Sequence, residues 1–333
     1  MTMQIAILIP DTTYAQLYPP NVQARLEALG PVMQATGSKD SLAEQAPALL
    51  ARAEALLAGP GTPSLQEGWL DAAPNLKIIG YSTGSVRGII PPTIFRRGIR
   101  LFHNAPVIAD AVAEFSIGLA LLWLRRYHIQ DRQFRAGVPW KEIQAAPGRL
   151  LAGRWAGLVG AGYVAQRHIR LLLAFGAYVR VYDPYLTLER AAELGVEKAT
   201  LEQVFGESEI IAVHAPKTPE THHMINADIL ARIQPDAILI QNSRAWAMDQ
   251  DALLRELQTG RFSAALDVFD KEPLAANSPF FQLDNVLLTP HMAGKARSTP
   301  GKLGHALVDE LERFQCGEPL RQEILAEKYD QLA

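Results

Sequence analysis

Three side chains with complementary chemistry stand late in the sequence, each shortly after a short apolar run typical of a buried strand. They are Arg244, Glu272 and His291. Each alone has an ordinary interpretation, as a surface cation, a solvated loop acid or one of eight histidines. Because the carboxyl ends of parallel strands meet at one edge of a sheet, where open α/β sheets bind ligands, we expect the three to serve one reaction.

The reaction that suits these groups is hydride exchange between a nicotinamide and a 2-oxo acid. Arg244 suits the substrate carboxylate, because a guanidinium binds it through two parallel hydrogen bonds. His291 suits proton transfer to the carbonyl oxygen, because histidine exchanges a proton near neutral pH. Glu272 suits the other imidazole nitrogen, where a carboxylate fixes the tautomer and favours the protonated ring.

The stretch 158–183 has the pattern of a dinucleotide-binding turn. The turn Gly160-x-Gly162-x-x-Ala165 follows an apolar run and begins an amphipathic helix, and a second apolar run leads to Asp183. The two glycines keep side chains away from the helix N-terminus, where a pyrophosphate binds. Asp183 lies 23 residues after Gly160, close to the ~20 expected for a carboxylate that binds an adenosine ribose. The pattern predicts a dinucleotide site.

Composition limits the remaining possibilities. The 333 residues suggest two domains, and the net charge of −3 gives no reason to expect nucleic acid or an anionic membrane as a partner. The single cysteine, Cys316, fits a reducing compartment, and the first ten residues resemble a strand rather than a signal peptide. The apolar stretch Ala111–Leu124 contains Glu114 and is expected to be too short for a bilayer. We expect a cytoplasmic protein with a small-molecule partner.

Apolar runs and helical patterns alternate along the chain, as in parallel α/β sheets. In the first hundred residues these segments are Ile5–Ile9, Val22–Leu29, Leu42–Leu57 and Leu76–Tyr81. Later strand-like runs are Tyr178–Tyr182, Ile210–Val213, Ala237–Gln241, Ala264–Val268 and Val286–Leu288. A long helix at Ile108–Tyr127 is expected to lead from the first domain to the second, and a last helix at Gly301–Phe314 to fold back on the first.

A possible substrate loop follows the run Leu76–Tyr81, at the carboxyl end of a strand. It reads STGSVRG and contains Thr83, Gly84, Ser85 and Arg87. Strand ends are where open α/β sheets place ligands, although an ordinary turn is about equally consistent with the spacing.

These motifs together resemble those of the D-isomer-specific 2-hydroxyacid dehydrogenases, the family of D-lactate dehydrogenase, D-3-phosphoglycerate dehydrogenase and glyoxylate/hydroxypyruvate reductase. The resemblance covers most of the chain: APNLKIIG, GIRLFHNAPVIADAVAE, the glycine turn, HAPKTPETHHMI, NSRA, LDVFDKEPL and NVLLTPH. It implies a Rossmann doubly wound parallel sheet as NAD-binding domain, residues 104–296. A smaller flavodoxin-like α/β substrate domain would comprise residues 1–103 and 297–333.

The resemblance also implies roles for individual residues. Arg244 would bind and polarise the substrate, His291 would be the acid/base and Glu272 its partner. The expected cofactor is NAD, and no metal is expected. The resemblance also implies a homodimer formed through the coenzyme domain, with the 108–140 region contributing. The implied cofactor contacts are Gly160, Gly162, Tyr163, Val164, Asp183, His214, Ala215, Pro216, Asn242, Ser243, Asp267 and Gly294. Of these, Asp183 would bind the ribose and Asp267 the nicotinamide carboxamide.

Some positions depart from the family pattern. The substrate loop has Arg87 where the family usually has an acid, so Arg87 either faces solvent or a structural partner, or adds positive charge near the substrate. Ala245 and Trp246 replace glycine and a small residue, which either narrows the site or is a neutral packing change.

The same residues also fit two other functions. A formate-dehydrogenase-like reaction is disfavoured by Glu272, because that relative has glutamine as the partner of its histidine. A dinucleotide-sensing corepressor-like protein would retain the same three residues. Asp183, followed by Pro184 and Tyr185 rather than arginine, favours NAD over NADP.

Overall fold

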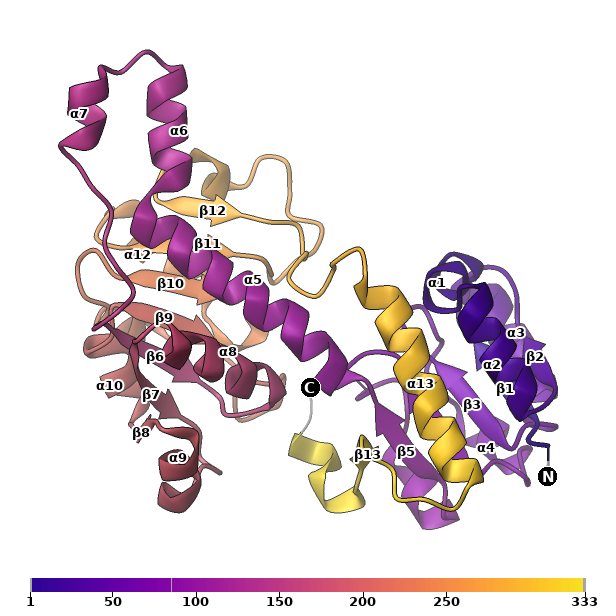
Figure 1. Cartoon of the computed structure of the whole chain (residues 1–333). Helices are drawn as coiled ribbons and strands as arrows, with labels where there is room; N and C mark the ends of the chain where they lie inside the picture. Colours follow the sequence, from indigo (N-terminus) through magenta and orange to yellow (C-terminus); the bar gives the residue numbers. More distant parts are fainter. Residues whose placement is uncertain (1, 85, 332–333) are drawn as a thin grey trace. The chain divides into compact units, whose positions relative to one another are not determined.

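The computed structural model describes residues 2–84 and 86–331. The chain divides into two compact units (Figure 1). The first comprises residues 1–108 and 296–333, and the second comprises residues 109–295.

The first unit contains a six-stranded sheet in the order β13-β5-β4-β3-β1-β2. Its strands are parallel except β13, which pairs antiparallel to β5. The strands are β1 (Ile5–Leu8), β2 (Val32–Gln34), β3 (Ala55–Ala58), β4 (Ile78–Tyr81), β5 (Arg100–His103) and β13 (Glu323–Ile324). β1, β3 and β4 are buried along their whole length, as expected for parallel strands covered on both faces.

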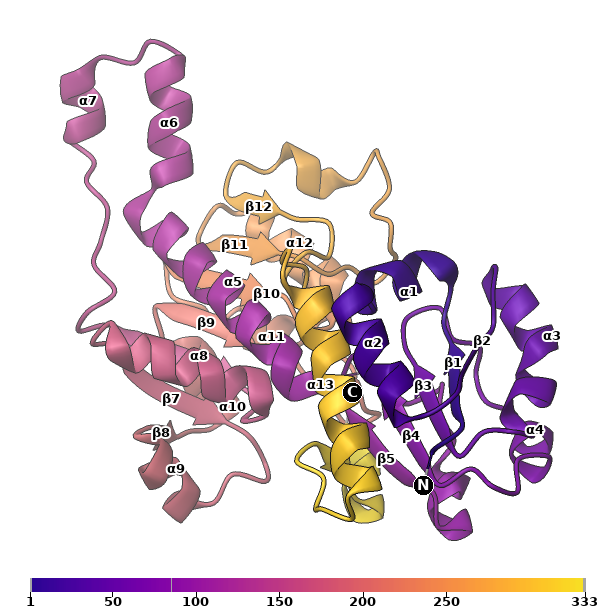
Figure 2. The same cartoon turned by 45° about the vertical axis from the view of Figure 1, so that its right-hand side comes forward.

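Helices cover both faces of this sheet. They are α1 (Asp11–Leu17), α2 (Pro20–Leu29), α3 (Lys39–Leu50), α4 (Glu67–Asp71), α13 (Thr299–Gln315) and the 3-10 helices η1 (Pro92–Arg97) and η4 (Ala326–Gln331). One core is shared by α1, α2 and α13, and a second by α3 and α4. Figure 2 shows α13 beside α2, so the prediction that the last helix packs on the first domain is confirmed.

The stretch Leu42–Leu57, which the sequence analysis treated as one segment, is a helix followed by a strand. α3 ends at Leu50, and Ala55–Ala58 forms β3 at the centre of the sheet. Its sequence, Ala-Leu-Leu-Ala, has high helix propensity, and burial on both faces overrides that preference. The short strands β2, β5 and β13 were also not predicted.

The second unit contains a parallel seven-stranded sheet in the order β12-β11-β10-β9-β6-β7-β8. Its strands are β6 (Trp155–Val159), β7 (Tyr178–Tyr182), β8 (Glu197–Lys198), β9 (Ile210–Val213), β10 (Ile238–Gln241), β11 (Ser263–Leu266) and β12 (Val286–Leu288). The order changes direction between β6 and β9, as in a doubly wound sheet. The predicted fold class is confirmed.

Helices lie on both faces of the second sheet as well. They are α5 (Ala105–Arg125), α8 (Tyr163–Ala174), α9 (Leu188–Leu194), α10 (Leu201–Gly206), α11 (Ala227–Leu230), α12 (Gln250–Gln258) and the 3-10 helices η2 (Ala245–Ala247) and η3 (Pro279–Gln282). α6 (Tyr127–Arg135) and α7 (Trp140–Gln144) form a hairpin that projects from the sheet (Figure 1). α5, α8 and α9 share one core, and α10, α11 and α12 share the other.

The long helix α5 has 21 residues and lies close to the expected Ile108–Tyr127, but its apolar part is longer than the expected stretch Ala111–Leu124. An 18-residue window has a mean hydropathy of 1.9. The argument that this segment is too short for a bilayer was therefore wrong, since length and composition would allow a span. Half of the window is buried, and its apolar residues Ile117, Trp123 and Leu124 pack into the core shared with α8, as in a core helix.

Candidate active site

The candidate residues of the second unit follow six strands that are consecutive neighbours in its sheet. His291 follows β12, Glu272 follows β11, Arg244 follows β10, His214 follows β9, Gly160 follows β6 and Asp183 follows β7. All six strands are parallel, so these residues lie at the same edge of the sheet.

The glycine turn connects β6 to α8 and leaves the start of the helix open. Gly160 has φ +99°, and a Cβ there would lie 2.9 Å from the His214 carbonyl oxygen. Gly162 differs: its φ is −72°, and an added Cβ would meet nothing within 4 Å. No side chain caps α8 at this position. The fold therefore requires glycine at 160, whereas at 162 the open N-terminus fits a bound pyrophosphate.

Asp183 holds this turn in place from the end of β7. Its Oδ2 accepts a hydrogen bond from the Ala161 N–H at 2.7 Å, and its Oδ1 accepts one from the Tyr185 N–H at 2.8 Å. Each carboxylate oxygen has a second lone pair. The arrangement fits a residue that also accepts a ribose hydroxyl.

Two histidines, one in α8 and one directly after β9, lie next to each other near the turn. His168 Nδ1 of α8 is 3.0 Å from His214 Nε2. Burial lowers the pKa of His214 to about 4 and that of His168 well below its usual value, so both rings are neutral at pH 7. The His214 imidazole is thus engaged within the fold, and a contact of this residue with a cofactor would come from its backbone. His168 was not singled out from the sequence.

His291 and Glu272 are in direct contact. His291 Nδ1 lies 2.7 Å from Glu272 Oε2, and both side chains keep some solvent exposure. A ring that donates from Nδ1 to the carboxylate has Nε2 left to exchange a proton with a substrate. The structure therefore brings together the imidazole and the acid that the sequence placed nineteen residues apart.

The charge of Glu272 is stabilised by its neighbours. Burial by itself raises the pKa of Glu272, but the hydrogen bond to His291, the bond from the Phe269 N–H and the charges of His291 and Arg244 lower it below its usual range. Arg244 is half-buried, and its guanidinium also donates to the Ser243 carbonyl at 2.8 Å. The guanidinium lies close enough to Glu272 to affect its ionisation, so all three predicted groups form one cluster.

Asp267 anchors the loop that carries His291. Its Oδ1 accepts hydrogen bonds from Thr289 Oγ1 at 2.6 Å and the Met292 N–H at 2.7 Å, and its Oδ2 accepts one from the Ala293 N–H at 2.8 Å. Its backbone carbonyl accepts the His291 N–H. These bonds hold His291 at φ +54°, a conformation unusual for histidine. This anchoring was not evident from the sequence, and the bond to the carboxamide stays a prediction.

Asn242 and Ser243 fix the end of β10. Asn242 is buried, and its Nδ2 donates to Ser116 Oγ of α5 at 2.7 Å. Ser243 Oγ donates to the Val213 carbonyl at the end of β9. Ser116 is a further residue that the sequence did not reveal, because a serine within an apolar helix carries no motif.

Trp246 packs against the neighbouring loop. Its Nε1 donates to the Thr218 carbonyl at 2.7 Å, and Lys217 Nζ lies 4.6 Å from the centre of its ring. These contacts support the interpretation of Trp246 as a packing change.

Comparisons with known proteins show which family the chain resembles. Residues 117–293 match the family model described as "D-isomer specific 2-hydroxyacid dehydrogenase, NAD binding domain". A glyoxylate reductase of Korarchaeum cryptofilum is 33% identical over 252 residues, which are 74% of this chain and 76% of that protein. A D-3-phosphoglycerate dehydrogenase of Mycobacterium tuberculosis is 33% identical over 273 residues, 81% of this chain and 51% of that protein.

Solved structures show the same likeness. A phosphoglycerate oxidoreductase from Rhizobium etli superposes with a TM-score of 0.81 and 29% identity, covering 96% of this chain and 97% of that one.

The chain belongs to the D-isomer specific 2-hydroxyacid dehydrogenases. It is accordingly an NAD-dependent oxidoreductase, and the matched residues 117–293 lie in the unit that holds the glycine turn.

The other predicted cofactor residues of this dehydrogenase lie in the same unit. Tyr163 and Val164 begin α8, Ala215 and Pro216 follow β9, and Gly294 lies within the loop between β12 and α13.

The predicted substrate loop of the dehydrogenase follows β4 in the first unit. Gly84 accepts a hydrogen bond at its carbonyl from His103 Nδ1, 3.3 Å away, and burial lowers the pKa of His103 to about 4. Arg87 Nη1 donates to the Asp330 carbonyl at 3.2 Å, a contact that supports its having a structural partner. Thr83 is partly exposed, and Ser85 lies outside the described residues.

Proposed function

We propose that the protein reduces a small 2-oxo acid to the D-2-hydroxy acid, with Arg244, His291 and Glu272 as its reactive groups. The observation that carries the proposal is the 2.7 Å contact of His291 with Glu272, close to the charge of Arg244. This contact lies at the same edge of the sheet as the glycine turn.

Bound NADH supplies the hydride. Arg244 binds the substrate carboxylate and draws electron density toward the carbonyl oxygen, which prepares the carbonyl carbon for attack. Protonated His291 gives the proton on Nε2 to that oxygen as it gains charge. Glu272 holds Nδ1–H, so the ring keeps its orientation and presents Nε2 to the substrate. In the reverse direction, neutral His291 removes the hydroxyl proton.

We also propose a preference for NADH over NADPH. A carboxylate at 183 repels a 2′-phosphate, and Asp183 is fixed in place by two backbone N–H groups. The residues after it, Pro184 and Tyr185, offer no cation to bind that phosphate.

The substrate is proposed to be a short 2-oxo acid, held in part by the loop at Thr83, Gly84 and Arg87. The names of the relatives make glyoxylate and phosphohydroxypyruvate the first candidates. Of these two, the hydrogen bond of Arg87 to Asp330 favours the monoanionic glyoxylate over the phosphorylated acid, because it gives this cation a structural role.

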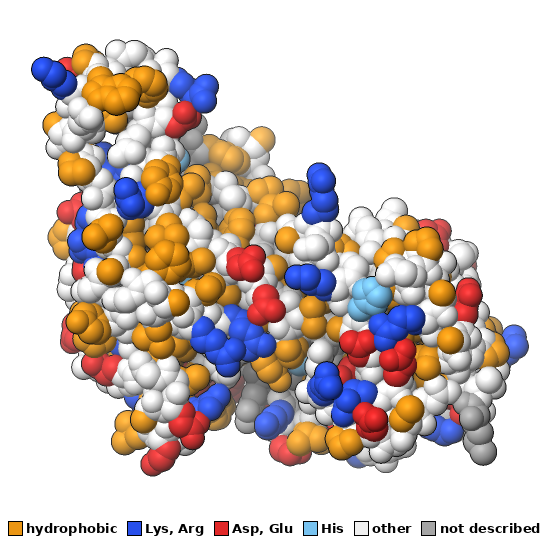
Figure 3. Space-filling view, in the orientation of Figure 1, with side chains coloured by type: hydrophobic (Ala, Val, Ile, Leu, Met, Phe, Trp, Pro, Cys, Tyr) orange, Lys and Arg blue, Asp and Glu red, His pale blue; other side chains and the backbone are white. Residues whose placement is uncertain are grey.

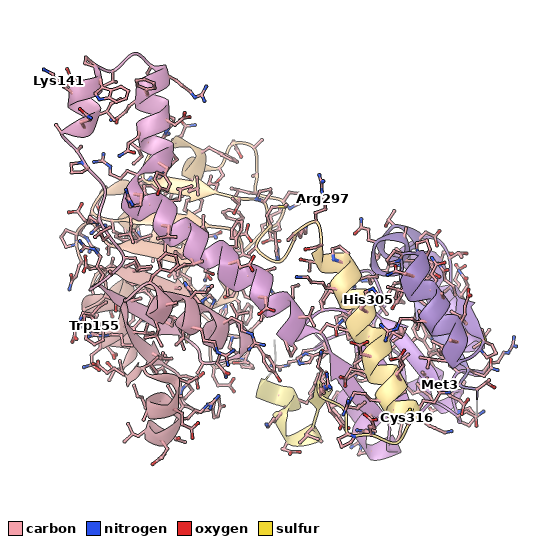
Figure 4. All side chains as sticks on the ribbon, in the orientation of Figure 1. Met3, Lys141, Trp155, Arg297, His305 and Cys316 are labelled. Carbon is pink, nitrogen blue, oxygen red and sulfur yellow. The ribbon has the colours of Figure 1, made fainter. Side chains whose placement is uncertain are left out.

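A homodimer formed through the α6–α7 hairpin is proposed for the assembly. Neither helix has a buried residue, and Phe134 and Trp140, with 57% and 63% of their surface exposed, contact each other edge to face. Figure 3 shows apolar side chains at the tip of this hairpin, and Figure 4 places Lys141 there. A second copy of the chain is the occupant that the family implies. We place the protein in the cytoplasm, in line with its single cysteine.

The test is oxidation of NADH with glyoxylate, pyruvate, hydroxypyruvate, phosphohydroxypyruvate and a branched 2-oxo acid, each compared with the His291→Ala variant. Turnover of at least one acid that the variant loses supports the proposal. Absence of turnover with all five acids, in protein that binds NADH, contradicts it and favours the dinucleotide-sensing alternative.

A further inference from the structure

The chain continues past α13 in a segment that runs back along the six-stranded sheet. Cys316 closes α13 (Figure 4), and β13 then pairs antiparallel to β5. Arg100 of β5 binds Glu323 of β13 through two hydrogen bonds of 2.7 and 2.6 Å. Buried Glu310 of α13 accepts the N–H groups of Arg321 and Gln322. Residues 317–331, here called the tail, are therefore firmly attached to the first unit.

Tyr329 and Asp330 of the tail contact the predicted substrate loop and the residues directly after it. Tyr329 is 4% exposed, and its hydroxyl donates to the Ile90 carbonyl at 2.5 Å. Its ring packs edge to face on Phe95, with centres 5.8 Å apart. The neighbouring residue, Asp330, accepts a hydrogen bond at its carbonyl from Arg87 at 3.2 Å. Two consecutive tail residues thus contact Arg87 of the loop and, two residues beyond its last residue Gly88, the Ile90 carbonyl.

The last residue of the loop and the two residues that follow it are held through consecutive backbone carbonyls. Ser64 Oγ donates to the Gly88 carbonyl at 2.6 Å, and the Leu65 N–H donates to the Ile89 carbonyl at 2.8 Å. The Ile90 carbonyl, next in line, receives the Tyr329 hydroxyl. Each hydrogen bond fixes the carbonyl of one residue, and Tyr329 of the tail donates the third of these bonds. The backbone at and just after the proposed substrate loop is therefore held in part by residues more than 200 positions later in the sequence.

We propose that the tail is a positioning element of the substrate loop, and that Tyr329, through the Ile90 carbonyl, sets the affinity for the 2-oxo acid. The inference rests on the proposed function, in which this loop binds the substrate. The contacts of Tyr329 are with the Ile90 carbonyl and the Phe95 ring, so its proposed action is through the backbone that follows the loop. Its loss should raise the KM for the 2-oxo acid and leave the chemical step largely intact.

The variant Tyr329→Phe removes only the hydroxyl, and Tyr18→Phe is its matched control. Tyr18 is fully buried in the same unit, and its hydroxyl has no hydrogen-bond partner among the described residues. One lost hydrogen bond predicts that Tyr329→Phe raises the KM for the 2-oxo acid by about 3- to 10-fold. The kcat and the KM for NADH should stay within about 2-fold, and Tyr18→Phe should leave all three constants unchanged. A lowered Tm with an unchanged KM would show a merely structural role and overturn the inference.

Hydrogen exchange of the peptide that covers residues 83–90 gives a readout that needs no turnover. Faster exchange in Tyr329→Phe than in wild type and Tyr18→Phe supports positioning of the loop by the tail, and equal exchange overturns it. Faster exchange with an unchanged KM contradicts the link to substrate affinity. If wild type reduces none of the five acids, the proposed function fails, while the exchange measurement still decides whether the tail positions the loop.

Discussion

The two sheets of this protein hold their functional loops in different ways. In the second unit, side chains with a predicted functional role also hold the backbone. Asp183 fixes the glycine turn, and Asp267 fixes the loop of His291. Glu272 binds both the His291 ring and the Phe269 N–H. In the first unit, the end of the proposed substrate loop and the two residues after it are held through carbonyl oxygens by Ser64, Leu65 and Tyr329, to which the proposed reaction assigns no chemical step.

This difference separates groups that should be essential from groups that should adjust affinity. A side chain that both reacts and supports a neighbouring loop cannot be replaced without losing both functions. A hydroxyl that holds one backbone carbonyl contributes about one hydrogen bond, which is worth only ~0.5 to 1.5 kcal/mol. Substitutions in the second unit should therefore have the larger effects on turnover.

The largest loss is expected from Arg244→Ala, which removes the group that binds and polarises the substrate. We expect kcat/KM for the 2-oxo acid to fall by about 100- to 10,000-fold, comparable with the loss of a general acid. Arg244→Lys keeps the charge but not the two-pronged geometry and should recover only part of the activity. Steady-state kinetics at saturating NADH measures both. A loss below about 3-fold would remove Arg244 from the site.

Glu272→Gln tests the support of the imidazole and should lower kcat by about 10- to 100-fold, since a hydrogen bond to a charged group is worth ~1.5 to 3 kcal/mol. The lowered pKa of Glu272 also predicts an effect on stability. Its pKa in the folded state lies below the value in the unfolded state, so its stabilising contribution is present above the unfolded pKa and is lost as pH falls through the folded pKa.

Urea unfolding of wild type and Glu272→Gln at pH 7 and pH 4 measures this contribution. The difference in stability between the two proteins should be smaller at pH 4. A difference that stays constant or grows on acidification would contradict the ionisation assigned to Glu272.

The glycine turn offers a sharper contrast within one loop. Gly162→Ala should raise the Kd for NADH by about 10-fold while stability changes little, because the added methyl meets only the space assigned to the pyrophosphate. Gly160→Ala should instead destabilise the fold, because of its φ of +99° and the His214 carbonyl. Fluorescence titration with NADH and thermal unfolding distinguish the two. Unchanged NADH binding by Gly162→Ala would mean that the cofactor does not approach the turn.

Most of the second unit could be predicted from the sequence because its motifs are local and its strands are continuous apolar runs. The glycine turn and Asp183 lie within one βαβ unit, and Arg244, Glu272 and His291 each follow a predicted strand. The hydrogen bonds that hold the loops of these residues could not be predicted, because they join residues that are distant in the sequence and belong to no motif. Examples are the bond between Asn242 and Ser116 and the bond between Thr289 and Asp267.

The first unit was harder for a physical reason. β3 has the sequence of a helix and becomes a strand only through burial between β1 and β4. β13 has two residues, too few for a periodic pattern, and Tyr329 meets a loop 239 positions earlier in the chain. One sequence gives no sign of such pairings.

The smallest effect on the chemistry is expected from the hairpin. Phe134→Ser with Trp140→Ser replaces the two most prominent apolar side chains there, and we expect the mass in solution to shift from dimer to monomer. Because the reactive groups lie at the sheet edge rather than on the hairpin, kcat at saturating substrate should stay within about 2-fold. Light scattering after size exclusion gives the mass, and Tyr185→Ser, an exposed aromatic outside the hairpin, is the control. A wild-type monomer would contradict the proposed assembly.

The central claim, that His291 supported by Glu272 transfers the proton, is tested most directly in a single turnover of His291→Ala with bound NADH. Titration of NADH fluorescence gives the Kd, and mixing with the 2-oxo acid gives the rate of NADH oxidation in the same sample. We predict a Kd within about 2-fold of wild type and a rate lower by about 100- to 10,000-fold. A rate within about 3-fold of wild type at an unchanged Kd would contradict the claim.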